Sequence, residues 1–213
     1  MVWKCLRARV KMIEFEPKKH VYTLEGKEIP SVSEITRFLS REVYKDADQA
    51  AMDIAADRGT RVHKACEELD REGLACGDYD IEGYVRAYGK FLNEHDVKWE
   101  MIEKPVYSKY LWIAGTVDRY GLVDGEPTIL DIKTTKTISG KHKVQYGAQL
   151  DFYKLMIKDA PDTAKEVILQ LREDGTYKMI EIKEHLAVAM SCLTLHRTFE
   201  NTRQKNRSRT PNG

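Results

Sequence analysis

Acidic residues that precede a lysine by two positions are the first feature of this sequence that could do chemistry. On a β-strand the side-chain period is two residues, so both members of such a pair project from the same face of a sheet. A metal-binding carboxylate beside a cation is suited to the cleavage of a phosphodiester. The sequence holds five such tripeptides, at 16–18, 25–27, 96–98, 131–133 and 181–183. Only the last two fall in segments that we expect to be strands.

The turn before Asp131 separates these two candidates. If Asp124-Gly125 is a two-residue type I′ turn, counting outward from it places Asp118 directly opposite Asp131, with Cβ atoms ~5 Å apart. Two carboxylates this close repel each other unless a cation or a proton lies between them. The same count around 174–175 places an isoleucine opposite Glu181, which supplies no second ligand. We therefore choose Asp131-Ile132-Lys133, although a longer turn would change this register.

A histidine on a predicted helix is a further candidate ligand. His63 and Glu67 lie four residues apart and therefore share a helix face, and Gly59 would let another backbone approach closely. By itself, a lone helical histidine is more often a surface residue or a satisfied core residue than a ligand.

A later helix carries a polar stripe. Gln145, Gln149 and Tyr153 recur every four residues along one helical face. Taken alone, this spacing favours the polar edge of an amphipathic helix.

The elements that must position these residues follow from hydrophobic periodicity and turn signals. Strands at 11–16 and 20–24 predict a small N-terminal β-hairpin, and the capping box Ser31-Val32-Ser33-Glu34 predicts a helix through about Leu39. We further expect helices at 47–72, 81–94, 144–157 and 184–200, and strands at 99–107, 112–123, 127–134, 165–171 and 176–183. This order predicts an α/β domain with a mixed central sheet.

Length and composition limit the classes of protein to which this chain can belong. The 213 residues suit a single domain, at 1–200 with a core at about 47–183, followed by a basic tail at 201–213. A net charge of +1 does not indicate a nucleic-acid binder, so any such surface must be local. We find no membrane span, no signal peptide and no paired cysteine motif, and expect a cytoplasmic protein. The tail has the composition of a flexible segment and could bind phosphate, although a solvated tail is the simpler interpretation.

Four motifs in one order resemble the PD-(D/E)xK nuclease superfamily, and specifically its RecB-like and phage-exonuclease-like branch. They are G-x-x-x-H at Gly59–His63, G-x-x-D at Gly115–Asp118, D-x-K at Asp131–Lys133 and Q-x-x-x-Y at Gln149–Tyr153. The resemblance covers about residues 59–155 and implies a restriction-endonuclease-like mixed sheet flanked by helices. The stretch from His20 to Ile35 also looks like the opening of small phage- or prophage-encoded nucleases.

The resemblance implies a role for each matching residue. Asp118, Asp131, the main-chain carbonyl of Ile132 and His63 would bind divalent metal ions. Lys133 would position or deprotonate the attacking water and stabilise charge on the phosphate. Glu67 would lie behind these ligands.

Other residues would contact nucleic acid. The resemblance implies that Gln149 and Tyr153 hold the backbone of the substrate near the metals, and Gln145 extends the same face. Arg58 and Arg61 could meet a terminal phosphate, although exposed helix arginines are common. The segment 109–112 could stack on a frayed DNA end, although a core position for its tryptophan is the favoured interpretation.

The cofactors and partners follow from the same resemblance. Oxygen ligands suit Mg²⁺, and an imidazole raises the suitability of Mn²⁺. We expect no iron–sulfur cluster, because Cys192 is the only cysteine near the C-terminus, and no ATP, because no phosphate-binding glycine loop occurs. The expected substrate is linear DNA, duplex or single-stranded, in a bacterial or phage-infected cell. A single-strand annealing protein is a candidate partner, and a homo-oligomer is compatible with the sequence.

The leading hypothesis is a metal-dependent DNA nuclease, in particular an exonuclease of phage or prophage type used in recombination, repair or DNA processing. One alternative is a catalytically silent nucleic-acid-binding or assembly module on the same fold, against which the intact Asp118, Asp131 and Lys133 argue. The other alternative is a metal-free structural domain whose matches to the four motifs are coincidental. The choice between exonuclease and endonuclease, the polarity, and DNA against RNA stay open.

Overall fold

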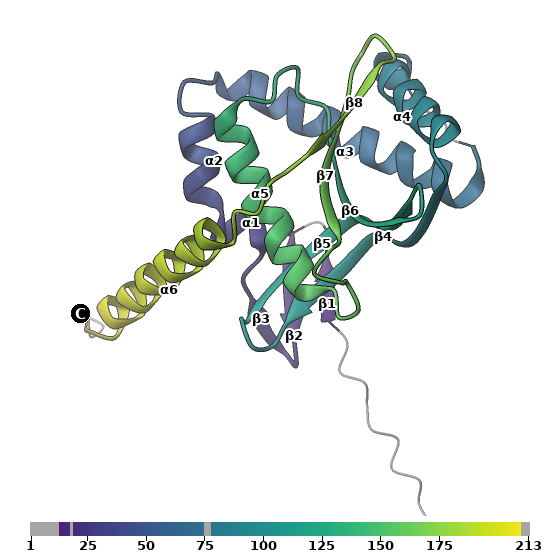
Figure 1. The fold of residues 1–213 in the computed structure, drawn as a ribbon. Helices are drawn as coiled ribbons and strands as arrows, with labels where there is room; N and C mark the ends of the chain where they lie inside the picture. The colour runs from purple at the N-terminus through teal and green to yellow at the C-terminus, as the bar shows by residue number, and fades with distance from the viewer. Residues whose placement is uncertain (1–12, 18, 75–77, 210–213) are drawn as a thin grey trace, which may run out of the picture.

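The helices and strands fall into an N-terminal β-sheet, a central β-sheet and helices on both sides of the latter (Figure 1). The computed structural model describes residues 13–17, 19–74 and 78–209, with the backbone alone at 201–209. The first elements are β1 (Ile13–Glu16), β2 (Val21–Leu24), β3 (Lys27–Ile29), α1 (Val32–Ile35), α2 (Arg37–Val43), α3 (Gln49–Glu72), a 3₁₀ turn (Tyr79–Ile81) and α4 (Glu82–Glu94). They are followed by β4 (Val97–Ser108), β5 (Ile113–Val123), β6 (Glu126–Lys133), α5 (Gly140–Met156), β7 (Lys165–Leu171), β8 (Tyr177–Glu181) and α6 (Leu186–Arg209).

The central sheet is mixed, as the order of elements predicts. Its five strands follow the chain, β4-β5-β6-β7-β8. Neighbouring strands are antiparallel except β6 and β7, which are parallel and joined by a crossover through α5. A parallel connection needs such a crossover because the chain must return to the same end of the sheet. The α/β class and the restriction-endonuclease-like arrangement are therefore confirmed.

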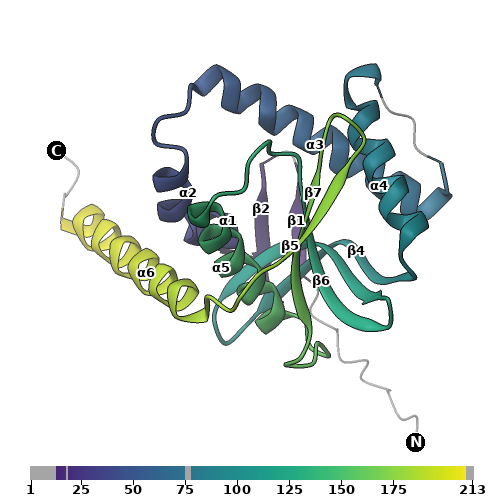
Figure 2. The ribbon, with the colours of Figure 1, turned by 45° about the horizontal axis from the view of Figure 1, so that its top comes forward.

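Helices cover both faces of this sheet (Figure 2). On one face, Val62 of α3 and Phe91 of α4 pack with Leu130 of β6. On the other face, Phe152 of α5 and Leu193 of α6 pack with Ile129. Adjacent residues of β6 thus face opposite layers, which is the period-two pattern of a strand buried on both sides.

The N-terminal sheet is larger than predicted. β1 and β2 form the expected hairpin, and β3 adds a third antiparallel strand to it. A strand of three residues is too short to show a periodicity, so the sequence alone did not reveal it. Residues 11 and 12 of the predicted first strand lie outside the described residues.

The helix boundaries differ from the predictions at three places. The capping box at Ser31 is present, but α1 ends at Ile35 and α2 continues after Thr36. α5 begins one turn earlier than predicted, at a second capping box formed by Ser139 and His142. The backbone of α6 continues through Arg209, so the predicted tail is helical over its described part, 201–209. The sequence has neither glycine nor proline between Gly175 and Pro211, and nothing in it stops the helix earlier. Within the described ranges, no helix is long and apolar enough to cross a membrane.

Candidate metal centre

The β5–β6 hairpin brings the two predicted carboxylates together. Both turn residues have positive φ, 52° at Asp124 and 81° at Gly125, as a type I′ turn requires. Strand pairing runs outward from this turn to Arg119 and Leu130, so the next pair is Asp118 and Asp131. The predicted register is confirmed. In addition, Oδ2 of Asp118 accepts a hydrogen bond of 2.8 Å from the main-chain N–H of Ile132.

A third carboxylate, which the sequence analysis missed, lies on the neighbouring strand. β4 pairs with β5 at Lys104 and Val117 and again at Ile102 and Arg119, which places Glu103 opposite Asp118. Glu103 has a φ of 44°, which is unusual for a residue other than glycine. Three adjacent strands therefore each contribute one acidic residue to the same place.

His63 reaches this acidic group from α3. Its Nδ1 lies 3.2 Å from Oε1 of Glu103 and 3.6 Å from Oδ2 of Asp118. Its Nε2 lies 3.0 Å from the main-chain carbonyl oxygen of Ile132. Ligand atoms of His63, Glu103 and Asp118 all lie within 4.8 Å of one another, close enough to hold one metal ion. One imidazole nitrogen among carboxylate and carbonyl oxygens is a donor set that fits Mg²⁺ or Mn²⁺.

Asp131 and Lys133 form the second half of the centre. Nζ of Lys133 lies 2.5 Å from Oδ2 of the nearly fully buried Asp131. The same ammonium lies 5.1 Å from the ring centroid of Tyr146, whose face attracts cations. The other carboxylate oxygen of Asp131, Oδ1, accepts a hydrogen bond of 3.3 Å from the side-chain amide of Gln149. Both oxygens of Asp131 are thus oriented by side chains that the sequence analysis singled out.

The electrostatics of the centre reflect the crowding of carboxylates. Burial lowers the pKa of His63, but Asp118 and Glu103 outweigh it and raise that pKa to about 9. Burial raises the pKa of Asp131 to about 6, with Lys133 opposing and Asp118 reinforcing the shift. For Lys133, burial lowers the pKa, while Asp131 and Asp118 dominate and raise it. The carboxylates of Asp118, Glu103 and Asp131 thus stabilise positive charge on the side chains beside them. A site that stabilises positive charge is suited to binding a cation.

A buried arginine holds the acidic residues in place. Arg119 is fully buried, and its Nη1 donates to Oε1 of Glu103 at 3.0 Å and to the main-chain oxygen of Asp118 at 2.6 Å. Its Nε forms an ion pair of 2.6 Å with Asp70 on α3, which also accepts a hydrogen bond of 2.8 Å from Tyr88 on α4. A charged residue inside the apolar strand β5 was the only sequence signal for this network.

Two of the predicted polar residues support the centre from α5. Tyr153 is buried, and its hydroxyl accepts a hydrogen bond of 3.0 Å from Gln149, so it orients Gln149 from behind. Gln145 instead donates to Ser40 on α2, at 2.9 Å, and ties the two helices together.

Two features of α3 differ from their predicted roles. The carboxylate that contacts His63 is Glu103 rather than Glu67, whose Oε1 accepts from Arg71 at 2.9 Å. Gly59 is not needed for a close backbone approach, because a Cβ added there would meet only Oγ1 of Thr134 among described atoms, at 3.9 Å.

The two predicted phosphate-binding arginines of α3 already have partners. Arg61 forms ion pairs with Asp57, Asp78 and Asp80 at 3.0, 3.1 and 2.6 Å, so a phosphate would have to displace three carboxylates. Arg58 lies over the ring of Tyr84, 5.4 Å from its centroid. Contact of either arginine with DNA stays a prediction.

The family of this chain follows from comparisons with known proteins. A family model for the PD-(D/E)XK nuclease superfamily matches residues 81–210, more than half of the chain. No curated protein matches. Among 16 matching chains of solved structures is a crystal structure of a protein called SSO0001, at 17% sequence identity and a TM-score of 0.41. That similarity covers 79% of this chain and 75% of the other.

Proposed function

Because the chain belongs to the PD-(D/E)XK nuclease superfamily, we propose that it is a Mg²⁺- or Mn²⁺-dependent deoxyribonuclease acting as an exonuclease on linear DNA. The observation that supports this most directly is the meeting of His63, Asp118 and the Asp131-Lys133 pair at one point, from α3, β5 and β6. The proposal extends to a role of phage or prophage type in recombination, repair or DNA processing, to which the resemblance of the N-terminal segment points.

The residues at the centre fit a divalent metal ion. We assign its binding to His63, Asp118, Asp131 and the main-chain carbonyl of Ile132, and add Glu103 because its carboxylate faces the same point. When bound, such an ion supplies positive charge that neutralises the phosphate and makes water a better nucleophile.

The remaining side chains position the substrate and the water. Gln149 fixes the orientation of the Asp131 carboxylate by donating to Oδ1. Lys133, held by Oδ2 of the same carboxylate, presents an ammonium group that can donate to a phosphate oxygen or to the attacking water. A fixed donor of this kind stabilises the charge that develops during hydrolysis without having to reorganise.

Digestion of labelled DNA tests the proposal. We would incubate end-labelled linear duplex, linear single strand and closed circular DNA with Mg²⁺, Mn²⁺ or Ca²⁺. Asp131→Ala and Lys133→Ala remove the centre, and Asp96→Ala and Lys98→Ala are matched controls, because they alter an exposed tripeptide of the same type. We expect loss of linear DNA alone, with Mg²⁺ and Mn²⁺ but not Ca²⁺, and no digestion by the first two variants.

Two results would overturn the proposal in different ways. Cutting of closed circles would make the protein an endonuclease. No metal-dependent cutting of any substrate by folded wild-type protein would favour the silent binding module on the same fold.

A further inference from the structure

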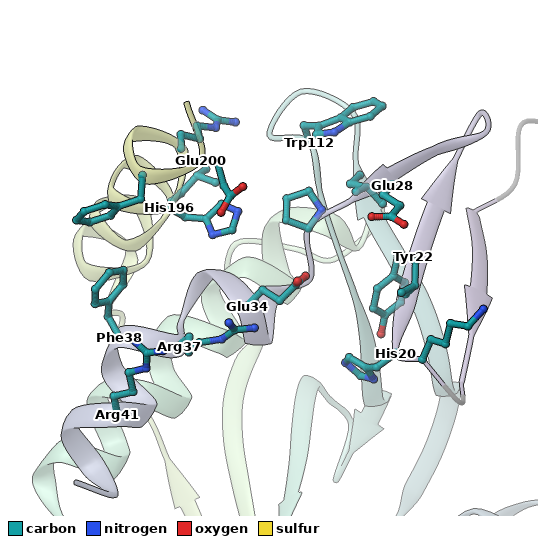
Figure 3. Close-up of a pocket in the computed structure, with 17 residues that line it drawn as sticks. His20, Tyr22, Glu28, Glu34, Arg37, Phe38, Arg41, Trp112, His196 and Glu200 are labelled. Carbon is teal, nitrogen blue, oxygen red and sulfur yellow. The ribbon is translucent and has the colours of Figure 1, made fainter. Parts of the chain in front are cut away.

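A groove of about 980 Å³ separates the N-terminal sheet from helices α2 and α6 (Figure 3). Its walls come from three parts of the chain: the stretch 19–41 from just before β2 into α2, Trp112 in the connection between β4 and β5, and residues 193–200 of α6. The volume is at the upper end of the ~300–1,000 Å³ that is typical of ligand sites.

The α2 wall of the groove presents uncommitted positive charge. Arg37 and Arg41 lie one turn apart on α2, and both are exposed. Neither has an ion pair with any residue that the structure describes. Three acids, Glu28, Glu34 and Glu200, also line the groove, and Glu34 accepts a hydrogen bond of 2.7 Å from the N–H of Ser31 as part of the helix cap. Two exposed arginines at this spacing are suited to successive phosphates of one strand.

Aromatic rings lie beside these arginines. Phe38 of α2 and Phe199 of α6 face each other with ring centroids 5.7 Å apart, and they are 44% and 51% exposed. On the opposite wall, the exposed ring of His20 lies 5.7 Å from the ring of the buried Tyr22 (Figure 3). Exposed rings beside exposed arginines are typical of sites where unpaired bases stack.

Tyr22 connects the groove with the strand that carries Asp118. Its ring lines the groove, while its hydroxyl is hydrogen-bonded to Oγ1 of Thr116 at 2.8 Å. Thr116 precedes Asp118 by two residues on β5. The wall of the groove is therefore tied directly to the strand that carries the central carboxylate.

We propose that this groove binds a single-stranded segment of DNA and leads it to the metal centre. The inference rests on the proposed nuclease function and names the form of its substrate. A blunt duplex hides its base faces by stacking, whereas an unpaired strand offers both base faces and phosphates to the rings and arginines. The terminal segments of the chain are unsuited to the groove by charge, because residues 1–12 and 201–213 each carry four basic residues and no acid.

Fluorescence anisotropy in EDTA tests the binding without cleavage. The probes are a labelled single strand of twelve nucleotides and a blunt duplex of the same length. The variants are Arg37→Ala/Arg41→Ala and Phe38→Ala. The matched control is Arg86→Ala/Lys90→Ala, which removes two exposed cations at the same spacing from α4.

We expect wild-type protein to bind the single strand more tightly than the duplex. The double arginine variant should lose at least ten-fold in single-strand affinity. The slope of its log affinity against log salt concentration should fall in magnitude by about 1.4, because two phosphate contacts are lost. Phe38→Ala should lose about five-fold or more with an unchanged salt slope. Equal affinity for both probes, or an equal loss in the α4 control, overturns the proposal.

Hydrolysis of bis(p-nitrophenyl) phosphate with Mn²⁺ separates this inference from the proposed function. This small diester reports on the metal centre without filling the groove, so the double arginine variant should match wild type. If wild-type protein hydrolyses no diester but keeps its preference for the single strand, the nuclease proposal fails and the groove assignment is supported. If hydrolysis is intact and the preference is absent, the groove assignment fails alone.

Discussion

His63 and Glu103 are forty positions apart in the chain, yet Nδ1 of the histidine lies 3.2 Å from Oε1 of the glutamate. The contact fixes the imidazole ring so that its other nitrogen faces the carbonyl of Ile132. Arg119 holds the same glutamate oxygen from the buried side at 3.0 Å. Glu103 therefore links the interior of the molecule to the metal centre.

Glu103→Gln is expected to weaken Mn²⁺ binding by about ten-fold or more, as loss of a group that orients or supplements metal ligands commonly does. The amide keeps the shape of the side chain and an oxygen for Arg119, but loses the negative charge beside His63. Isothermal titration with Mn²⁺ measures the change. Glu100→Gln, an exposed position on the same strand, is the control and should bind Mn²⁺ like wild type. Unchanged affinity in Glu103→Gln would remove Glu103 from the site.

The sequence predicted one carboxylate pair and missed the third acid for a physical reason. Asp118 and Asp131 are joined by a two-residue turn whose residue types fix the register, so counting was sufficient. Glu103 is related to Asp118 through the longer connection 109–112, whose length and conformation residue types do not specify. The positive φ of Glu103 is also not typical of a β-strand, so a strand pattern in the sequence does not predict it.

Lys133→Met is expected to separate cleavage from metal binding. The lysine contacts Asp131 but contributes no ligand atom, so Mn²⁺ affinity should remain while cleavage of linear DNA falls by about 10²–10³. Asp131→Asn should lose both. Single-turnover digestion and Mn²⁺ titration on the same preparations measure the two effects. Lys136→Met, an exposed lysine just beyond β6, should digest DNA like wild type. Loss of Mn²⁺ binding in Lys133→Met would show that the lysine acts through the fold of the site.

Long-range ion pairs are the other feature that the sequence did not predict. Arg61 is an exposed helical arginine by pattern, and only its partner at Asp57 lies within one helical turn. Asp78 and Asp80 reach it from beyond the end of α3. Such contacts depend on how helices pack, which residue spacing along one helix does not contain.

Arg119→Met is expected to lower the free energy of unfolding by about 3–5 kcal/mol, because it leaves Asp70 buried without its ion-pair partner. Burial already raises the pKa of Asp70, with Arg119 opposing that shift. Adding Asp70→Asn removes the unpaired charge, so the double variant should be destabilised by less than the sum of the two single changes. Urea denaturation of the four proteins measures the coupling. Simple additivity would mean that the two side chains stabilise the fold independently.

Gly115→Ala should destabilise the protein through Tyr153. A Cβ at position 115 would lie 2.7 Å from Cε1 of Tyr153 and 3.2 Å from Cγ2 of Val32. Overpacking of this kind costs about 1–3 kcal/mol, and it would also displace the hydroxyl that orients Gln149. Gly140→Ala is the control, because a Cβ there meets no described atom within 4 Å. Thermal unfolding should show a lower midpoint for Gly115→Ala and an equal or higher one for Gly140→Ala.

The buried carboxylate of Glu166 makes stability depend on pH. Burial raises the pKa of Glu166 to about 7, Asp151 reinforces the shift, and Lys154, 3.5 Å away, opposes it. A carboxyl group whose pKa is higher in the folded state binds its proton more tightly there. The free energy of unfolding should therefore fall as the pH rises from about 4.5 to 7 and change little from this group above 7.

Glu166→Gln removes this titration and should flatten the profile. We expect the variant to be more stable than wild type at pH 8, by on the order of 2–3 kcal/mol, and similar to it near pH 4.5. Urea denaturation at both pH values measures the difference between the two proteins, in which groups common to both cancel. Glu181→Gln, at an exposed position on the adjacent strand β8, should follow the wild-type profile. Greater stability of Glu166→Gln at pH 4.5 than at pH 8, relative to wild type, would contradict a raised pKa, because it would require the ionised glutamate to be the form that the folded protein favours.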